Sequence, residues 1–302
     1  MKKLIYCPKF ILKIRRRRRK THEMVVEKFY SIGSKIENYI TDKQLQRNKE
    51  FLSFGYWKNN TKTYINAAEN LLQFFIKNSE IKKVSKIANV ACGYGTETFA
   101  FYNVFKPTMI IGIDITKQHV DYANEKSRVL NLEKKVKFYH GNACILDFPD
   151  NTFSHILGIE GPAHFNSREK FFNSAYRVLN KNGELLLTDI IGGREFKTKK
   201  GIQKYIMNFS GKKWHVPKVN WVDENTYKQQ LNQAGLKVIF LKLIGNKVFP
   251  GYANNAFSFK TIKTRIRQRG IFGTIGLTII SYLLNYLYKK GIIEYIYVKA
   301  QK

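Results

Sequence analysis

The sequence predicts an α/β fold in which helices cover both faces of a doubly wound, mostly parallel sheet. Short apolar runs alternate with segments of helical apolar spacing along most of the 302 residues, as such a sheet requires. The first apolar run, residues 86–91, ends at a tight turn that contains Gly93 and Gly95. The second run, residues 109–113, ends at Asp114. Because ligands of these sheets bind at the carboxyl ends of the strands, we expect the site there.

The segment before the first strand is predicted to be an N-terminal helical cap over residues 23–80. Apolar residues recur at helical spacing in residues 23–40 and 62–77, which indicates two helices. The aromatic stretch FLSFGYW, residues 51–57, joins them. Aromatic side chains are as often plain core as ligand contacts. Within this stretch we expect only Tyr56 to line a substrate site.

The segment after the Gly-rich turn continues the alternation of helix and strand. A helix begins at Thr96, and Asn180 to Gly183 form a predicted turn. Further helices are predicted at 119–130, 171–179 and 226–234. Further strands are predicted at 135–139, 153–159, 184–189, 236–244 and 291–300. Residues 192–220 are polar and basic, with apolar residues that fit a helical cap over the site. We place the core domain at residues 81–302.

A second insertion, residues 251–290, precedes the last strand. Arg265, Arg267 and Arg269 are followed by an apolar stretch at 271–288. This stretch is of borderline length for a membrane span, which needs about twenty apolar residues. A span would also separate the last strand from its sheet. We expect a monotopic helix or an apolar lid whose flanking cations meet lipid headgroups, with a buried core helix as the alternative.

The charge of the chain is strongly positive and uneven. The formal net charge is +31, and ten of the first twenty residues are Lys or Arg. This basic arm, residues 1–22, is compatible with a solvated tail, an organelle transit peptide or a polybasic anchor on an anionic membrane. Interleaved apolar residues favour the membrane anchor. The arginines at 15–19 follow the apolar residues, which is the wrong order for a secretory signal.

The cysteines indicate a reducing compartment. Cys7, Cys92 and Cys144 are widely spaced and form no CxxC or Cys–His pattern. We expect neither a disulfide framework nor a zinc site, and hence no metal at the functional site. A cytoplasmic protein is expected, peripheral on a membrane if the basic arm is an anchor, with organelle targeting by the arm as the alternative.

The turn and the acid after the second strand favour a nucleoside ligand. Two glycines let the backbone approach a ligand closely, and a carboxylate at the position of Asp114 can accept hydrogen bonds from a ribose diol. NAD fits less well, because Glu97 and Thr98 stand where the third glycine of a dinucleotide site should be. A nucleoside without a pyrophosphate fits better.

These motifs resemble a known family. IANVACGYG at residues 87–95, followed by IIGIDIT at 110–116, is similar to the first two motifs of class I S-adenosylmethionine-dependent methyltransferases. Within that family, the small-molecule and lipid enzymes related to the sterol, tocopherol and phosphoethanolamine methyltransferases look most similar. The resemblance implies a Rossmann-like seven-stranded sheet, whose last strand would insert antiparallel at the sheet edge.

The resemblance also implies the residues that bind S-adenosyl-L-methionine. They are Ala91, Gly93, Gly95, Asp114, Ile115, Asn142, Ala143 and Ile159.

Four of the positions depart from the family pattern. Asn89 and Ser154 replace usual acids, Ala91 replaces a common glycine, and Asn142 replaces the Asp that accepts a hydrogen bond from the adenine amino group. Asn142 keeps an acceptor oxygen. Fewer carboxylates reduce the attraction for a sulfonium, so either the affinity is lower or other acids, Glu97 or Glu160, compensate.

The resemblance places the chemistry after the fourth strand, where Glu160 and His164 follow. We expect both to be catalytic, with His164 as general base on a substrate hydroxyl or as the group that holds the substrate in line. Because the sulfonium is already activated, orientation and exclusion of water supply most of the catalysis of an in-line displacement. Trp214 and His215, in the 192–220 insertion, are weaker substrate-side predictions.

The predicted function is methyl transfer to an apolar or lipid-like small molecule. A nucleic-acid methyltransferase is the first alternative, since the charge permits it. Glu160-Gly161-Pro162-Ala163 stands where an amino-methylating nucleic-acid enzyme would carry Asn or Asp-Pro-Pro-aromatic, so nucleic acid is not the expected partner. A catalytically weak S-adenosylmethionine-binding protein is the second alternative. The acceptor atom and the oligomeric state are left open.

Overall fold

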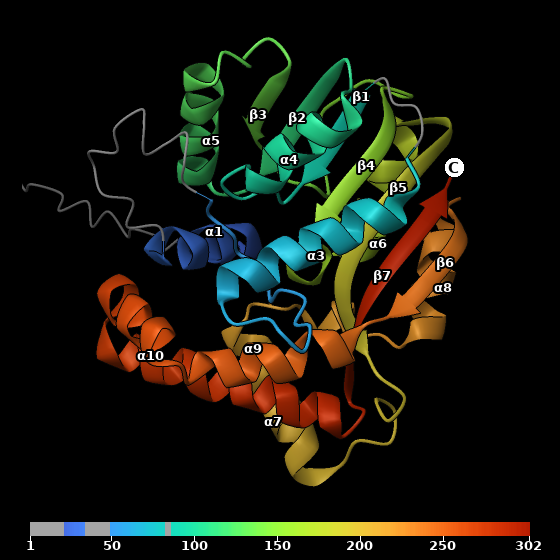
Figure 1. Ribbon diagram of the computed structural model, residues 1–302. Helices are drawn as coiled ribbons and strands as arrows, with labels where there is room; N and C mark the ends of the chain where they lie inside the picture. Colours follow the sequence, from blue (N-terminus) through green and yellow to red (C-terminus); the bar gives the residue numbers. More distant parts are fainter. Residues whose placement is uncertain (1–20, 34–48, 82–85) are drawn as a thin grey trace, which may run out of the picture.

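A seven-stranded mixed sheet organises the molecule. The computed structural model describes residues 21–33, 49–81 and 86–302 (Figure 1). The strands lie in the order β3-β2-β1-β4-β5-β7-β6. They are β1 (Lys86–Val90), β2 (Met109–Asp114), β3 (Val136–His140), β4 (Phe153–Ile159), β5 (Leu179–Gly192), β6 (Lys237–Leu243) and β7 (Ile293–Gln301). The first five pair in parallel, whereas β7 is antiparallel to both β5 and β6. The predicted fold class is confirmed.

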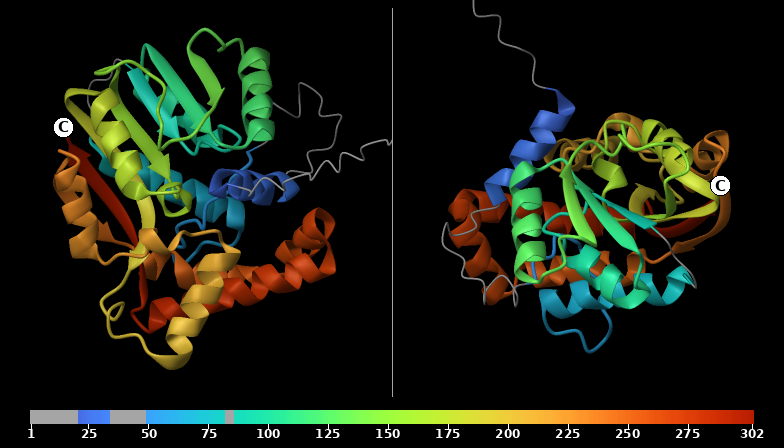
Figure 2. Two further views of the ribbon diagram at one scale, coloured as in Figure 1. Left: turned by 180° about the vertical axis from the view of Figure 1, so that it is seen from behind. Right: turned by 90° about the horizontal axis from the view of Figure 1, so that it is seen from above.

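Helices cover both faces of this sheet (Figures 1 and 2). The first group comprises α3 (Tyr64–Ser79), α4 (Thr96–Phe105), α5 (Lys117–Val129), α9 (Phe249–Ala256) and α10 (Phe259–Lys289), whose apolar side chains share one core cluster. The second group comprises α6 (Arg168–Val178) and α8 (Glu224–Gln233), which bury their apolar faces in a second cluster. The two clusters meet the two faces of the same strands, because alternate strand residues point to opposite faces.

The remaining helices lie near the carboxyl ends of the parallel strands. They are α1 (His22–Gly33), α7 (Gly201–Lys213) and the short 3₁₀ helices η1 (Pro162–His164), η2 (Lys218–Asn220) and η3 (Gly245–Lys247). In Figure 1, α1 lies below α5, between that helix and α10. The predicted helix at 23–40 agrees with α1 up to Gly33, and its second half lies outside the described residues. The basic arm, except for its last two residues, lies outside them too.

Two predictions about the sheet are wrong in detail. The predicted turn at 180–183 belongs to β5, where the pairing of β4 with β5 shifts register between Phe153 and His155. Asn182, at φ 63°, accommodates the extra residues. The last strand, β7, is antiparallel as expected but lies between β5 and β6, so that β6 forms the edge. Strand neighbours are set by tertiary pairing, which the periodicity of one strand does not report.

The 251–290 insertion folds into α9 and a long helix, α10, that kinks at Gly270, where φ is 73°. Only a residue without a Cβ adopts this conformation cheaply. Figure 1 shows α10 below α1 and α3, at one end of the molecule. Within the part of the chain that the structure describes, the segment Arg269–Lys289 is the one helix whose length and mean hydropathy of 1.5 would permit a membrane crossing.

Candidate functional site

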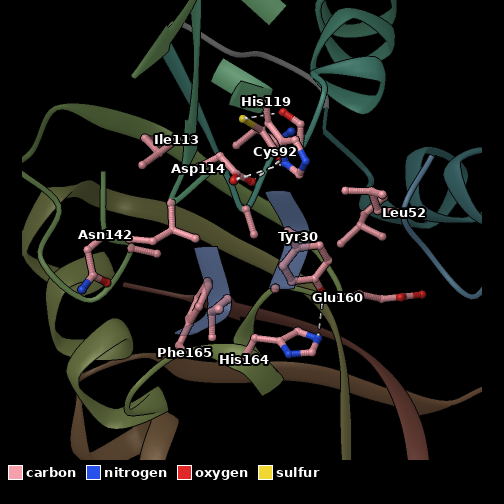
Figure 3. Close-up of a pocket in the computed structure, with 18 of the residues that line it drawn as sticks. Tyr30, Leu52, Cys92, Ile113, Asp114, His119, Asn142, Glu160, His164 and Phe165 are labelled. Carbon is pink, nitrogen blue, oxygen red and sulfur yellow. Dashed lines mark hydrogen bonds and ion pairs between the residues drawn. The ribbon is translucent and has the colours of Figure 1, made fainter. Parts of the chain in front are cut away.

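A cavity opens at the carboxyl ends of the parallel strands. Its walls come from the strand ends, from α1, from the segment after residue 49 and from the end of α7 (Figure 3). It brings together most of the residues predicted from the sequence. These lining residues are Ala91, Gly93, Asp114, Ile115, Asn142, Ala143, Ile159, Glu160, His164 and Trp214. Their roles remain predictions, but their convergence on one cavity is a feature of the fold.

Three predicted site residues do not line this cavity. Gly95 caps the N-terminus of α4 at φ 79°, and a Cβ there would lie 2.6 Å from the Phe138 ring. Tyr56 stacks on Phe74 with ring centroids 5.0 Å apart, outside the lining of this cavity. His215 packs edge-on against Phe29 at 4.9 Å and thus stands behind the wall rather than in it.

The turn after β1 brings bare backbone to the cavity. Gly93 has φ 50°, and a Cβ added to it would lie 3.1 Å from Leu52 Cδ1. Ala91 also has positive φ, 51°, a conformation that costs an L-residue about 1–2 kcal/mol. This strain explains why a glycine is common at that position in the family that the sequence resembles. Ala91 Cβ also closes the space beside Gly161, where an added Cβ would meet it at 2.6 Å.

Asp114, at the end of β2, is held as an ionised carboxylate. Its Oδ2 accepts a hydrogen bond from Gly93 N–H and its Oδ1 one from Thr116 N–H, both at 2.8 Å. Burial alone would raise the pKa of Asp114. The hydrogen bond and charge of His119, with the two backbone donors, outweigh burial and lower that pKa instead. A fixed negative charge therefore stands beside the bare backbone of the turn.

Glu160 has the opposite environment. It follows β4 with φ 61°, and its Oε1 accepts hydrogen bonds from Phe54 N–H at 2.8 Å and Tyr295 O–H at 2.7 Å. Loss of hydration raises the pKa of Glu160 to about 8, although these two donors counteract it. Loss of hydration also raises the pKa of Glu97, to about 7. Both acids can therefore change protonation near neutral pH, which makes Glu160 suited to accept a proton there.

His164 is neutral at neutral pH. Burial lowers the pKa of His164 to about 4. Its Nε2 lies 3.1 Å from Tyr30 Oη, and its carbonyl oxygen lies 2.9 Å from His22 Nε2. Figure 3 shows Tyr30 between Glu160 and His164. Since so low a pKa makes a weak base, the geometry favours an orienting role for His164 and leaves proton acceptance to Glu160.

Three departures from the family pattern have hydrogen-bond partners. Ser154 Oγ donates to the carbonyl oxygen of Lys86 at 2.9 Å. Asn89 is buried and donates a hydrogen bond to Thr98 Oγ1 at 2.7 Å. Asn142 Oδ1 accepts a hydrogen bond from Cys144 N–H at 2.9 Å.

Several residues that line the cavity were not predicted from the sequence. They are His22, Glu23, Val26, Tyr30, Leu52, Phe54, Cys92, Tyr94, His119 and Phe165, among others. Helical spacing put Tyr30 in the predicted helix at 23–40 but could not indicate its partner 134 residues away. His119 offered a local signal, since it stands five residues after Asp114, at the start of a predicted helix, and its Nδ1 lies 3.6 Å from Asp114 Oδ1.

Comparison with known proteins identifies the family. Residues 81–236 match the family described as "Methyltransferase domain". The chain belongs to this family.

Relatives of the chain extend this result. The erythromycin 3''-O-methyltransferase of Saccharopolyspora erythraea is 29% identical over 70% of this chain and 70% of its own length. A ubiquinone/menaquinone biosynthesis C-methyltransferase of Pasteurella multocida is 28% identical over 55% of each chain. The methyltransferase assignment thus rests on relatives that methylate different atoms of small molecules, and it makes the protein an enzyme.

Solved structures share the fold. The [4+2]-cyclase SpnF superposes with a TM-score of 0.69 at 18% identity, covering 93% of this chain and 96% of its own. The geranyl diphosphate C-methyltransferase of Streptomyces coelicolor A3(2), in complex with Mg²⁺, geranyl diphosphate and S-adenosyl-L-homocysteine, superposes with a TM-score of 0.70 at 11% identity, covering 93% and 98%. At these identities the likeness concerns the fold alone.

The protein is a class I S-adenosylmethionine-dependent small-molecule methyltransferase. Its cavity fits this methyl donor. A glycine whose Cβ would fill the cradle next to Leu52 adjoins an ionised Asp114, and both line the cavity. Gly93, Asp114, Asn142 and Ala143 would hold the nucleoside part, as predicted from the sequence.

Proposed function

We propose that the enzyme methylates a largely apolar, lipid-like small molecule by in-line displacement. When bound, the donor supplies a methyl group already activated by a sulfonium. The protein then has to hold the acceptor, align it and exclude water. The observation that carries the proposal is the apolar character of the cavity wall next to Glu160 and His164.

Aromatic rings from distant segments form that wall. Phe54 packs against Trp214 at 5.3 Å and against Tyr252 at 4.6 Å between ring centroids. Trp214 also lies 6.5 Å from the His164 ring. Such a surface gains free energy by burying an apolar molecule and offers few hydrogen bonds to a highly polar one. This supports an apolar acceptor over a small charged one.

Polar groups beside these rings can give the acceptor a direction. The Tyr30–His164 pair can orient one polar group of the acceptor through hydrogen bonds. Glu160, with its pKa near 8, can take the proton that an oxygen or nitrogen acceptor releases on methylation. With a carbon acceptor, a double bond would take the methyl group, and the same carboxylate would then accept the proton that the resulting cation loses.

Donor binding is the first part of the test. We expect calorimetry to show S-adenosylmethionine binding to the wild type and roughly a tenfold or greater loss of affinity in Asp114→Asn, because the variant removes the fixed charge. Asp121→Asn, which alters an exposed acid paired with Lys117, is the matched control and should bind as the wild type does. Equal binding by Asp114→Asn would contradict the assigned donor site.

Acceptor preference is the second part. Labelled methyl donor is offered with sterols, prenylated quinones and macrolides on one side and phosphoethanolamine on the other. Transfer of label to the apolar group is expected, and Glu160→Gln should bind the donor normally yet lose about a hundredfold in turnover with an oxygen or nitrogen acceptor. Label found in phosphoethanolamine alone would overturn the apolar acceptor while leaving the methyltransferase intact.

A further inference from the structure

The outer face of α10 carries a stripe of exposed apolar side chains. Beyond the kink at Gly270, the stripe consists of Ile271, Phe272, Ile275, Ile279 and Tyr282, which are 62%, 91%, 51%, 50% and 57% exposed. At about 100° of rotation per residue, these five positions fall within about 100° of arc on one side of the helix. The stripe is therefore one continuous surface, and large exposed apolar patches mark interaction sites.

The opposite face of the same helix is partly polar. Thr274, Ser281 and Asn285 are buried. Thr274 and Ser281 donate to carbonyl oxygens one turn back, those of Gly270 and Leu277, both at 2.8 Å. A helix on a water-exposed surface normally buries its apolar side and exposes its polar side. Here the exposed side is the more apolar one, which indicates that water is not its only environment.

Exposed cations lie at both ends of the stripe, and the stretch of sequence that contains it has no acidic residue. Lys260, Lys263 and Arg267 are exposed before the kink, and Lys289 and Lys290 are exposed after the stripe. Between Glu224 and Glu294 the sequence contains no acidic residue. An apolar strip with basic ends matches an anionic lipid surface, since insertion of side chains and attraction of phosphates add. A protein partner would more often present a polar rim of mixed charge.

The packing of α10 is compatible with a helix that lies on a membrane surface but not with one that crosses the bilayer. Its inner side buries Ile280, Leu284 and Leu287 in the protein core. β7 begins at Ile293, a few residues after the helix ends, and lies inside the sheet. A crossing helix would have to leave both contacts. The helix can lie flat at the interface without losing either.

We propose that the stripe and its flanking cations dock the enzyme on an anionic lipid bilayer, with α10 parallel to the membrane plane. The docking goes beyond the proposed function, because it holds for any acceptor. It also has a consequence for the site. Arg269 Cζ lies 5.2 Å from the Phe29 ring of α1, and the neighbouring Tyr30 lines the cavity. The helix that covers the cavity therefore contacts the docked helix.

Vesicle co-sedimentation of the full chain tests the proposal. Wild type is mixed with vesicles of phosphatidylcholine alone or with added phosphatidylglycerol. We expect binding to the mixed vesicles that weakens as salt is raised. The double variant Phe272→Ser/Ile275→Ser should bind about tenfold more weakly. The variant Lys263→Gln/Arg267→Gln should lose a similar factor at low salt and little at high salt.

Matched controls separate this surface from the rest of the basic chain. Val104→Ser/Ile145→Ser removes two other exposed apolar side chains, 54% and 72% exposed. Lys134→Gln/Lys181→Gln removes two exposed cations elsewhere. Because every variant keeps the basic arm, a difference between the pairs reports on α10. Equal vesicle binding by the α10 variants and their controls would overturn the proposal.

A second copy of the chain is the competing occupant of the stripe. Analytical ultracentrifugation without lipid decides between the two. A wild type that is monomeric at micromolar concentration supports a bilayer partner. The surface would be assigned to self-association if the wild type is a dimer that does not bind vesicles and the Phe272→Ser/Ile275→Ser variant is a monomer. All of these measurements are independent of methyl transfer, so they can fail or succeed separately from the proposed function.

Discussion

Asp114 and Glu160 are two carboxylates in one cavity whose surroundings drive their pKa values in opposite directions. Hydrogen bonds from the backbone and His119 stabilise the charge on Asp114, whereas Glu160 loses hydration with fewer donors in return. The difference assigns separate tasks to chemically similar groups: Asp114 provides a permanent charge for binding, and Glu160 a proton acceptor that works near neutrality.

The raised pKa of Glu160 predicts how stability depends on pH. Its folded-state pKa, about 8, exceeds the ordinary value of 4.5. Between these values the folded protein holds more protons than the unfolded chain, so stability falls as pH rises. Glu97 acts in the same direction. We expect Glu160 to cost on the order of 5 kcal/mol of unfolding free energy at a pH above both values, measured by urea denaturation.

Glu160→Gln should flatten that dependence, because Gln stays neutral and its carbonyl oxygen can still accept from Phe54 and Tyr295. Glu133→Gln, an exposed position, is the control and should follow the wild-type curve. Stability of wild type that rises between about pH 5 and pH 8 would contradict the assigned environment.

At the scale of elements, one buried ion pair joins the pieces that frame the site. Arg168, at the start of α6, binds Asp189 of β5 through Nε–Oδ2 at 2.6 Å and Nη2–Oδ1 at 3.0 Å. The same guanidinium donates to the carbonyl oxygen of Asn220 in η2. Asn220 in turn donates to the carbonyl oxygens of Ala163 and Phe165, on either side of His164. The orientation of His164 therefore depends on a charge pair outside the cavity.

Removal of Arg168 should be strongly destabilising. Arg168→Met leaves Asp189, which is fully buried, as an uncompensated charge, and we expect a loss of about 3–5 kcal/mol in unfolding free energy. Arg168→Met/Asp189→Leu should recover much of it. Arg128→Met, which breaks an exposed pair with Glu125, should change stability by about 0.5 kcal/mol or less. A mild effect of Arg168→Met in chemical denaturation would refute the role of the pair.

Much of this framework was predictable from sequence because it is local. Strand and helix positions agreed within a few residues, since apolar periodicity is a property of neighbours along the chain. The Gly93 turn and Asp114 were found for the same reason. Arg168, Asn220 and Tyr30 were not, because each is defined by partners far away in sequence. Tyr56 stacks on Phe74 rather than lining the cavity, because an aromatic position does not reveal which of two surfaces it packs on.

At the scale of the whole molecule, the net charge of +31 works against compactness. Like charges that are brought together on folding repel one another. Within the described residues, most ion pairs that offset this repulsion are exposed, and such pairs contribute little. Screening by salt should therefore stabilise the fold.

We expect the melting temperature to rise by about 5 °C when sodium chloride is raised from low to physiological ionic strength, because the Debye length then shortens to about 8 Å. Scanning calorimetry or fluorescence gives the measurement. Sodium sulfate at equal ionic strength controls for ion-specific effects. A melting temperature that falls with salt would show that attractive pairs outweigh the repulsion. Vesicle docking should respond to salt in the opposite sense.

The position of β7 determines when this protein can finish folding during its synthesis. β5 and β6 are synthesised before α9, α10 and β7, and each lacks its sheet neighbour until β7 is inserted between them. Until then two strand edges and the apolar stripe of α10 are open at once, which favours aggregation of the nascent chain. Co-translational folding therefore stops at a sheet that lacks β7 and cannot yet include β6. A chaperone or membrane surface near the ribosome would protect this incomplete sheet until Ile293–Gln301 has been synthesised.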